Sequence, residues 1–206
     1  MSLDRLIAGF NSFRSLHYLK RGGEIRTMAK TGQKPEVCLI ACSDARVDPA
    51  ILFNTDPGEV FIIRNVAALV PPYAPDGQHH GTSAAVEYAV RDLKVKHIVV
   101  LGHSGCGGIE ALTDKSASLI SQREFIGAWV SLAEEAQRDA GFPDGGGAVE
   151  VERSSVLLSV RNLAGFPWIA ERVEEGTLSL HGWRFNLLEG KLEFLTEGDE
   201  HLKMIE

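Results

Sequence analysis

Two apolar runs in this chain each end in side chains that bind metals. Residues 37–41 lead directly into Cys42, and residues 97–102 lead into His103, with Cys106 three positions further on. Both runs are typical of buried strands, and the loops that follow parallel strands meet at one edge of an open α/β sheet. We therefore expect an α/β fold in which these two strands are neighbours, so that two thiols and one imidazole share a single site.

The three side chains form a ligand set suited to zinc. A structural zinc site fills all four tetrahedral positions with protein groups, whereas a catalytic site leaves one position for water. Cys42, His103 and Cys106 leave that position open, which predicts a zinc-activated water. Asp44 and Arg46 follow the first cysteine at a spacing that allows an ion pair beside the metal. Either segment alone fits a buried cysteine or a surface salt bridge, but their joint placement favours the metal site.

The rest of the chain alternates strands and helices, which predicts a mostly parallel sheet flanked by helices. The expected strands are residues 36–41, 59–63, 97–102, 178–185 and 192–195. The expected helices are residues 79–94, 106–113, 122–139, 148–163 and 167–176. Because the strands that carry the ligands must be adjacent, we expect the strand order 2-1-3-4 with an antiparallel fifth strand at the edge.

We expect a single domain over residues 1–206, in which residues 1–31 form a helical N-terminal arm. Apolar side chains recur in this arm at helical spacing, with a break near Gly22. The arm either folds back on its own core or packs across a partner subunit, and the spacing fits both.

The composition of the chain restricts which binding partners and which cellular compartment are expected. The net charge of −7 argues against nucleic acid or an anionic membrane as a partner. No apolar run approaches the length of a membrane span, and the first residues lack the apolar core of a signal peptide. Three cysteines, an odd number, do not suggest a disulfide framework, and Cys38 inside the first strand is predicted to be a core thiol. These features favour the cytoplasm.

Four segments carry a resemblance to a known family, namely Ala41–Val47, Phe61–Ala67, Glu87–Val90 and Leu101–Ile109. In this order and at these spacings the chain resembles a β-class carbonic anhydrase, and the resemblance covers nearly all of it. The resemblance implies the reversible hydration of carbon dioxide to bicarbonate and a proton by attack of a zinc-bound hydroxide. It also implies one zinc per chain on the three ligands named above, with Asp44 and Arg46 as the catalytic dyad.

The resemblance is to the plant-like branch of that family, whose active site is open. It implies that Gln33, Phe61, Val66 and Tyr88 line the carbon dioxide pocket. Part of this pocket comes from a partner subunit in the family, so we expect a homodimer or a higher homo-oligomer. The backbone N–H groups near Gly107 begin a helix and suit an anionic product. Without the resemblance, Gln33 fits a turn residue, Phe61 strand core and Tyr88 an aromatic residue on the buried face of a helix.

The chain departs from family patterns at several positions. Ala68 stands where many members have Asn, and Asp92 stands where some plant members have His, so a proton shuttle there is unsupported. One bacterial branch binds bicarbonate at a regulatory site through Trp, Arg and Tyr. Only Arg64 matches that set, because the other positions are Leu39 and Phe185. We therefore expect no inhibition by bicarbonate.

Two rival functions follow from the same residues. Related folds hydrolyse carbonyl sulfide or carbon disulfide, and a larger or more channelled pocket would favour that activity. A non-catalytic zinc protein is the other alternative. The Asp44–Arg46 pair and the open fourth position argue against it.

Overall fold

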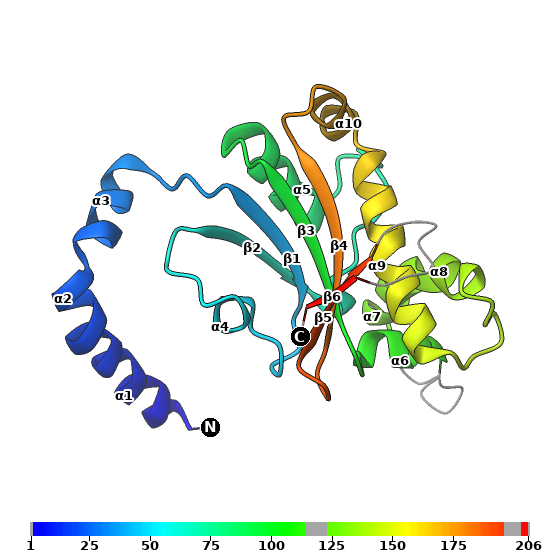
Figure 1. The fold of residues 1–206 in the computed structure, drawn as a ribbon, viewed down its shortest axis with the longest axis horizontal. Coiled ribbons are helices and arrows are strands. Elements are labelled where there is room, and N and C mark those ends of the chain that lie inside the picture. The colour runs from blue at the N-terminus through cyan, green and yellow to red at the C-terminus, as the bar shows by residue number, and fades with distance from the viewer. Residues whose placement is uncertain (1, 114–122, 196–202, 206) are drawn as a thin grey trace.

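The computed structural model describes residues 2–113, 123–195 and 203–205 of the chain. A twisted central sheet carries helices on its flanks, and the N-terminal helices project away from it (Figure 1). The strands are β1 Val37–Cys42, β2 Val60–Asn65, β3 His97–His103, β4 Ser179–Asn186, β5 Lys191–Leu195 and β6 Lys203–Ile205. Their order is β2-β1-β3-β4-β5-β6.

The strand order confirms the prediction from the ligand positions. Strands β2, β1, β3 and β4 run parallel, and β5 pairs antiparallel with β4. The short strand β6 adds antiparallel to β5, so β5 is not the outermost strand. A strand of three residues is too short to produce a periodic pattern in the sequence, which is why β6 was not expected.

The helices are close to their predicted positions. They are α1 Leu3–Phe13, α2 Leu19–Arg21, α3 Gly23–Thr31, α4 Pro49–Leu52, α5 Gly81–Glu87, α6 Gly107–Thr113, α7 Ile126–Val130, α8 Glu134–Asp139, α9 Ala148–Ala164 and α10 Pro167–Glu174. The single helix predicted over residues 122–139 is divided into α7 and α8 by a 3₁₀ turn, Ser131–Ala133, and residue 122 lies outside the described residues. The four-residue helix α4 was not predicted. Asp48 caps it by accepting hydrogen bonds from the N–H groups of Ala50 and Ile51.

One face of the sheet packs against α5, α9 and α10 in a common apolar core. Two glycines let α9 approach the strands closely. A Cβ on Gly102 of β3 would lie 2.5 Å from Val156 Cγ2, and one on Gly182 of β4 would lie 3.1 Å from Val156 Cγ1. Because Gly102 directly precedes His103, this close approach places α9 beside the carboxyl end of β3, where one predicted ligand lies.

The N-terminal arm, α1 to α3, does not fold back over the sheet (Figure 1). Helices α1 and α3 contain no buried residue. Several large apolar side chains of the arm are exposed: Leu3, Leu6, Ile7, Phe10, Phe13, Leu16 and Leu19. Of the two alternatives, packing on the chain's own core is therefore wrong, and packing across a partner subunit stays a prediction.

Among the described residues, no helix has the length and apolar character needed to cross a bilayer.

Candidate metal centre

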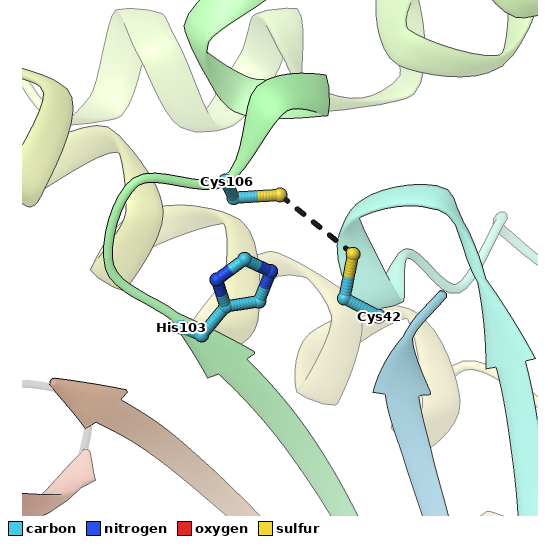
Figure 2. Close-up of side chains that lie close together, drawn as sticks. All are labelled: Cys42, His103 and Cys106. Carbon is cyan, nitrogen blue, oxygen red and sulfur yellow. Dashed lines mark hydrogen bonds between the residues drawn. The ribbon is translucent and has the colours of Figure 1, made fainter. Parts of the chain in front are cut away.

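The three predicted ligands come together at the carboxyl ends of β1 and β3 (Figure 2). Cys42 ends β1, His103 ends β3, and Cys106 lies in the turn before α6. Their ligand atoms all lie within 4.8 Å of one another. The two sulfurs are 3.9 Å apart, far beyond a disulfide bond. Two sulfurs bound at about 2.3 Å to one tetrahedral zinc would be about 3.8 Å apart, so the spacing fits a shared metal.

The imidazole ring of His103 points its Nε2 atom at the two sulfurs (Figure 2). Its Nδ1 lies 3.0 Å from the carbonyl oxygen of Ser104 and donates to it, which leaves Nε2 as the free acceptor. This Nε2 is buried and has no hydrogen-bond partner among the residues that the structure describes. A buried polar atom without a partner costs about 1–3 kcal/mol, and a metal ion would satisfy it. In the described ranges, no other group of three or more His, Cys, Asp or Glu side chains converges in this way.

The two thiols are electrostatically unequal. The two sulfurs are in hydrogen-bond contact, and either can be the donor; with Cys106 as the donor, the bond lowers the pKa of Cys42 and raises that of Cys106. The backbone N–H of Ala67 also donates to Cys42 Sγ, at 3.3 Å. Both contacts favour the thiolate form of Cys42, which is the form that binds zinc.

Asp44 and Arg46 form the ion pair expected from their spacing. The Asp44 carboxylate accepts from Arg46 Nη2 at 2.7 Å, from Nε at 3.0 Å and from the backbone N–H of Arg46 at 2.8 Å. These bonds hold the pKa of Asp44 well below its usual range. Asp44 Oδ2 also lies 3.8 Å from His103 Nε2, so an ionised carboxylate stands beside the ligand cluster.

Arg64 of β2 holds the loop that carries both Cys42 and the dyad. Its guanidinium donates to the carbonyl oxygen of Cys42 at 3.0 and 2.9 Å, and to those of Asp44 and Val47 at 2.8 Å each. A further bond, at 3.3 Å, reaches Asp48. The sequence suggested Arg64 only as one member of a bicarbonate site. Its real contacts are to backbone oxygens, and these leave no trace in side-chain patterns.

The turn after β2 has an unusual backbone. Ala67 and Ala68 have φ values of +67° and +54°, in the left-handed region that residues with a Cβ seldom adopt. This conformation directs the N–H of Ala67 at Cys42 and places Val66 against Gly108, where a Cβ would lie 2.9 Å from Val66 Cγ1. The strained turn therefore forms one wall of the ligand cluster.

Three predicted pocket residues do not reach the metal centre of their own chain. Gln33 is exposed and precedes the amino end of β1, whereas Cys42 lies at the carboxyl end. Phe61 pairs with Cys38, which puts it about 13 Å along the strand from Cys42 at about 3.3 Å per residue. The ring of Tyr88, half-exposed, lies 5.9 Å from that of Phe61. Val66 and Gly107, in contrast, adjoin the ligands.

Cys38 is a core thiol and not a ligand. It is fully buried in the apolar cluster under α5 and α9. Burial raises its pKa to about 12, from an ordinary value of 9.0.

The raised pKa of Cys38 predicts a pH dependence of stability. Above pH 9 the unfolded chain releases the Cys38 proton while the folded protein keeps it. The free energy of unfolding therefore decreases as the pH rises from about 9 towards 12. The free energy of unfolding should fall more steeply for the wild type than for Cys38→Val, by about 1.4 kcal/mol per pH unit. Urea denaturation between pH 8 and 11 measures both slopes. Parallel profiles for the two proteins would contradict this assignment.

Known proteins that are similar to this chain are carbonic anhydrases, in agreement with a zinc site at these residues. A family model described as carbonic anhydrase matches residues 37–192. A carbonic anhydrase of Pseudomonas aeruginosa is 37% identical over 194 residues, which are 92% of this chain and 86% of that protein. Beta carbonic anhydrase 5, chloroplastic, of Arabidopsis thaliana is 36% identical over 189 residues, or 89% of this chain. This chain spans 62% of the length of that plant relative.

Solved structures show the same architecture. The β-carbonic anhydrase CcaA superposes with a TM-score of 0.86 at 31% identity, covering 97% of this chain and 98% of that one. One of two tetrameric β-carbonic anhydrases from Sordaria macrospora gives a TM-score of 0.77 at 29% identity, covering 93% and 95%. By sequence and by fold, this chain belongs to the carbonic anhydrase family, in its β class.

Proposed function

We propose that this chain catalyses the reversible hydration of carbon dioxide to bicarbonate and a proton, with one zinc ion held by Cys42, His103 and Cys106. The observation that carries the proposal is the buried Nε2 of His103, which has no hydrogen-bond partner in the described part of the chain and lies beside two thiols, in a chain of this family. When bound, zinc would acidify a water molecule so that hydroxide is available near neutral pH. The residues around the ligands orient the reactants.

Asp44 is the group that orients the water. Its carboxylate, kept ionised by Arg46, accepts the O–H of a water at the ligand cluster and turns an oxygen lone pair towards the substrate carbon. The fork of Arg46 engages both carboxylate oxygens, which fixes the direction of the remaining lone pairs. Arg46 is in turn anchored by donating to the carbonyl oxygen of Gly105 at 2.8 Å.

Carbon dioxide needs an apolar surface next to that water. Val66 supplies part of it, and we infer that Gln33, Phe61 and Tyr88 of a second copy supply the rest. The exposed apolar side chains of the arm and the half-exposed Tyr88 support a homodimer or a larger assembly in which the arm crosses to the partner. The solved tetrameric relatives point the same way. A monomer in sedimentation velocity would contradict this inference.

Stopped-flow measurement of carbon dioxide hydration tests the function. The zinc-loaded protein should acidify a carbon dioxide solution far faster than the buffer alone, and the chelated protein should not. A protein that holds one zinc per chain and yet gives no acceleration would be a zinc scaffold, and the proposed activity would be wrong.

We further predict that bicarbonate does not switch this protein off. Arg64 donates to the loop carbonyl oxygens and to Asp48, the side chain of Leu39 offers no indole N–H, and that of Phe185 offers no hydroxyl. Each missing hydrogen bond to a charged group is worth about 1.5–3 kcal/mol, so losing two weakens such a site by orders of magnitude. Initial rates at increasing bicarbonate concentration should show no sigmoidal inhibition. Sigmoidal loss of activity would contradict this prediction.

A further inference from the structure

A glutamate outside every sequence motif contacts the backbone between two of the ligands. Glu152 of α9 is buried, with 5% of its surface exposed. Its Oε1 accepts hydrogen bonds from the N–H of Gly105 at 2.7 Å and from the N–H of Cys106 at 3.4 Å. These are the backbone groups of the turn that connects His103 to Cys106. The carboxylate of Glu152, on α9, therefore binds the backbone of this turn.

The other oxygen of Glu152 is fixed by a buried chain of charges. Arg184 of β4 is 2% exposed and donates to Glu152 Oε2 at 2.9 and 2.6 Å. Its Nη1 donates to Glu193 of β5 at 2.7 Å, and Glu193 also accepts two bonds from Arg153, at 2.9 and 3.2 Å. Two carboxylates and two guanidinium groups thus alternate and balance in charge. Since a buried charge is costly without its partner, each member is held in place by the next.

The peptide group between Gly105 and Cys106 is held from both ends. Its carbonyl oxygen accepts from Arg46 of the dyad at 2.8 Å, and its N–H donates to Glu152 at 3.4 Å, beside the shorter 2.7 Å bond that Glu152 accepts from the preceding N–H, that of Gly105. Gly105 adopts φ +64°, a left-handed conformation that the two bonds fix. The orientation of this one peptide sets where Cys106 leaves the backbone and where Arg46 is anchored.

We propose that Glu152 is a positioning residue for the metal centre, acting through the Gly105–Cys106 peptide on Cys106 and on the Arg46–Asp44 pair. The inference rests on the zinc site proposed above. A carboxylate that served only to balance Arg184 would have no effect on the metal once both charges were removed together. A carboxylate that positions the turn acts through its acceptor oxygen, which an amide can replace.

Two charge-balanced double variants separate these roles. Glu152→Gln with Arg184→Met keeps an acceptor for the turn, whereas Glu152→Leu with Arg184→Met removes it, and both lose the same ion pair. Glu193 retains Arg153 in each. Zinc affinity is measured by competition with a chromophoric chelator, and the ligand geometry is measured from the absorption bands of the cobalt-substituted protein.

The leucine double variant should bind zinc about 10–100-fold more weakly than the glutamine double variant, because groups that orient metal ligands have effects of this size. Its cobalt bands should shift, while those of the glutamine variant stay close to the wild type. Equal affinities and equal spectra for the two doubles would overturn this inference alone. A wild-type protein that binds no zinc would overturn the proposed function and this inference together.

A second pair keeps every charge, in case the leucine variant does not fold. Glu152→Asp and Glu193→Asp each shorten a buried carboxylate by one methylene, on opposite sides of Arg184. Only the first draws the acceptor away from Gly105, so only Glu152→Asp should weaken zinc binding and shift the cobalt bands. Equal zinc affinities for the two aspartate variants would also overturn the inference.

Discussion

Replacing Cys106 with alanine is expected to remove most of the zinc and all measurable hydration of carbon dioxide. The variant leaves Cys42 and His103 as the only protein ligands of the cluster, whereas catalytic zinc sites use three. It also removes the hydrogen bond that lowers the pKa of Cys42, so the remaining thiol is less readily ionised. Metal analysis after passage through a chelator, together with stopped-flow kinetics, measures both losses.

Cys38→Val is the matched control for this experiment. It also removes one buried cysteine, but from the apolar core and not from the ligand cluster. Such a swap of similar volume costs less than about 1.5 kcal/mol, and it should leave zinc content and activity unchanged. If Cys106→Ala retained full zinc, or if Cys38→Val lost it, the ligand assignment would be wrong.

Asp44→Asn is expected to keep zinc and to lose about 100-fold or more of the hydration rate, the size typical of a positioned proton acceptor. In the wild type, the Asp44 carboxylate accepts three hydrogen bonds from Arg46. An amide keeps only one acceptor oxygen, and its NH₂ group must face either the guanidinium or the reacting water as a competing donor. The dyad would therefore lose both its charge and the direction of its lone pairs.

The control for Asp44→Asn is the same change at Asp48 in the same loop. Asn also caps helices well, so α4 should keep its start, and only the 3.3 Å contact with Arg64 weakens. We expect Asp48→Asn to retain nearly full activity. Full activity in Asp44→Asn would rule out its orienting role, and loss of zinc in that variant would give Asp44 a structural role instead.

The strand order could be predicted because the positions of the metal ligands in the sequence restrict which strands can be neighbours. Cys42 and His103 can share a metal only if β1 and β3 are adjacent, and the structure pairs them. The elements that were not predicted are short, such as α4 and β6, or interrupted, as between α7 and α8. Local patterns carry little signal over three or four residues, and tertiary contacts decide these segments.

The contacts that support the site were hidden for different reasons. Arg64 and Glu152 hold the ligand-bearing loops through backbone atoms, and contacts of this kind leave no pattern of side chains in the sequence. Glu152 also depends on Arg184, which lies on another element and is adjacent only in the fold. Ala67 adopts a left-handed conformation that its residue type does not suggest. Sequence patterns locate groups that act through their own chemistry, and they miss groups that hold the backbone of others.

The contribution of a second copy to the pocket was expected from the resemblance alone, and the spacing of residues along the chain gave no sign of it. Phe61 and Tyr88 lie together but far along the sheet from Cys42, so one chain cannot close the pocket that the resemblance implies. Spacing along a chain does not show which copy supplies a residue. The exposed apolar arm is the structural feature that best supports the proposed second copy.

Exchange of ¹⁸O between labelled carbon dioxide and water, followed by mass spectrometry at chemical equilibrium, tests the central claim most directly. It reports the interconversion of carbon dioxide and bicarbonate without depending on a pH indicator. The zinc-loaded wild type should accelerate the loss of label, with a rate that increases with pH, while Cys106→Ala and the chelated protein should match the buffer. A zinc-loaded wild type that loses label no faster than buffer, or an undiminished rate in Cys106→Ala, would contradict the account.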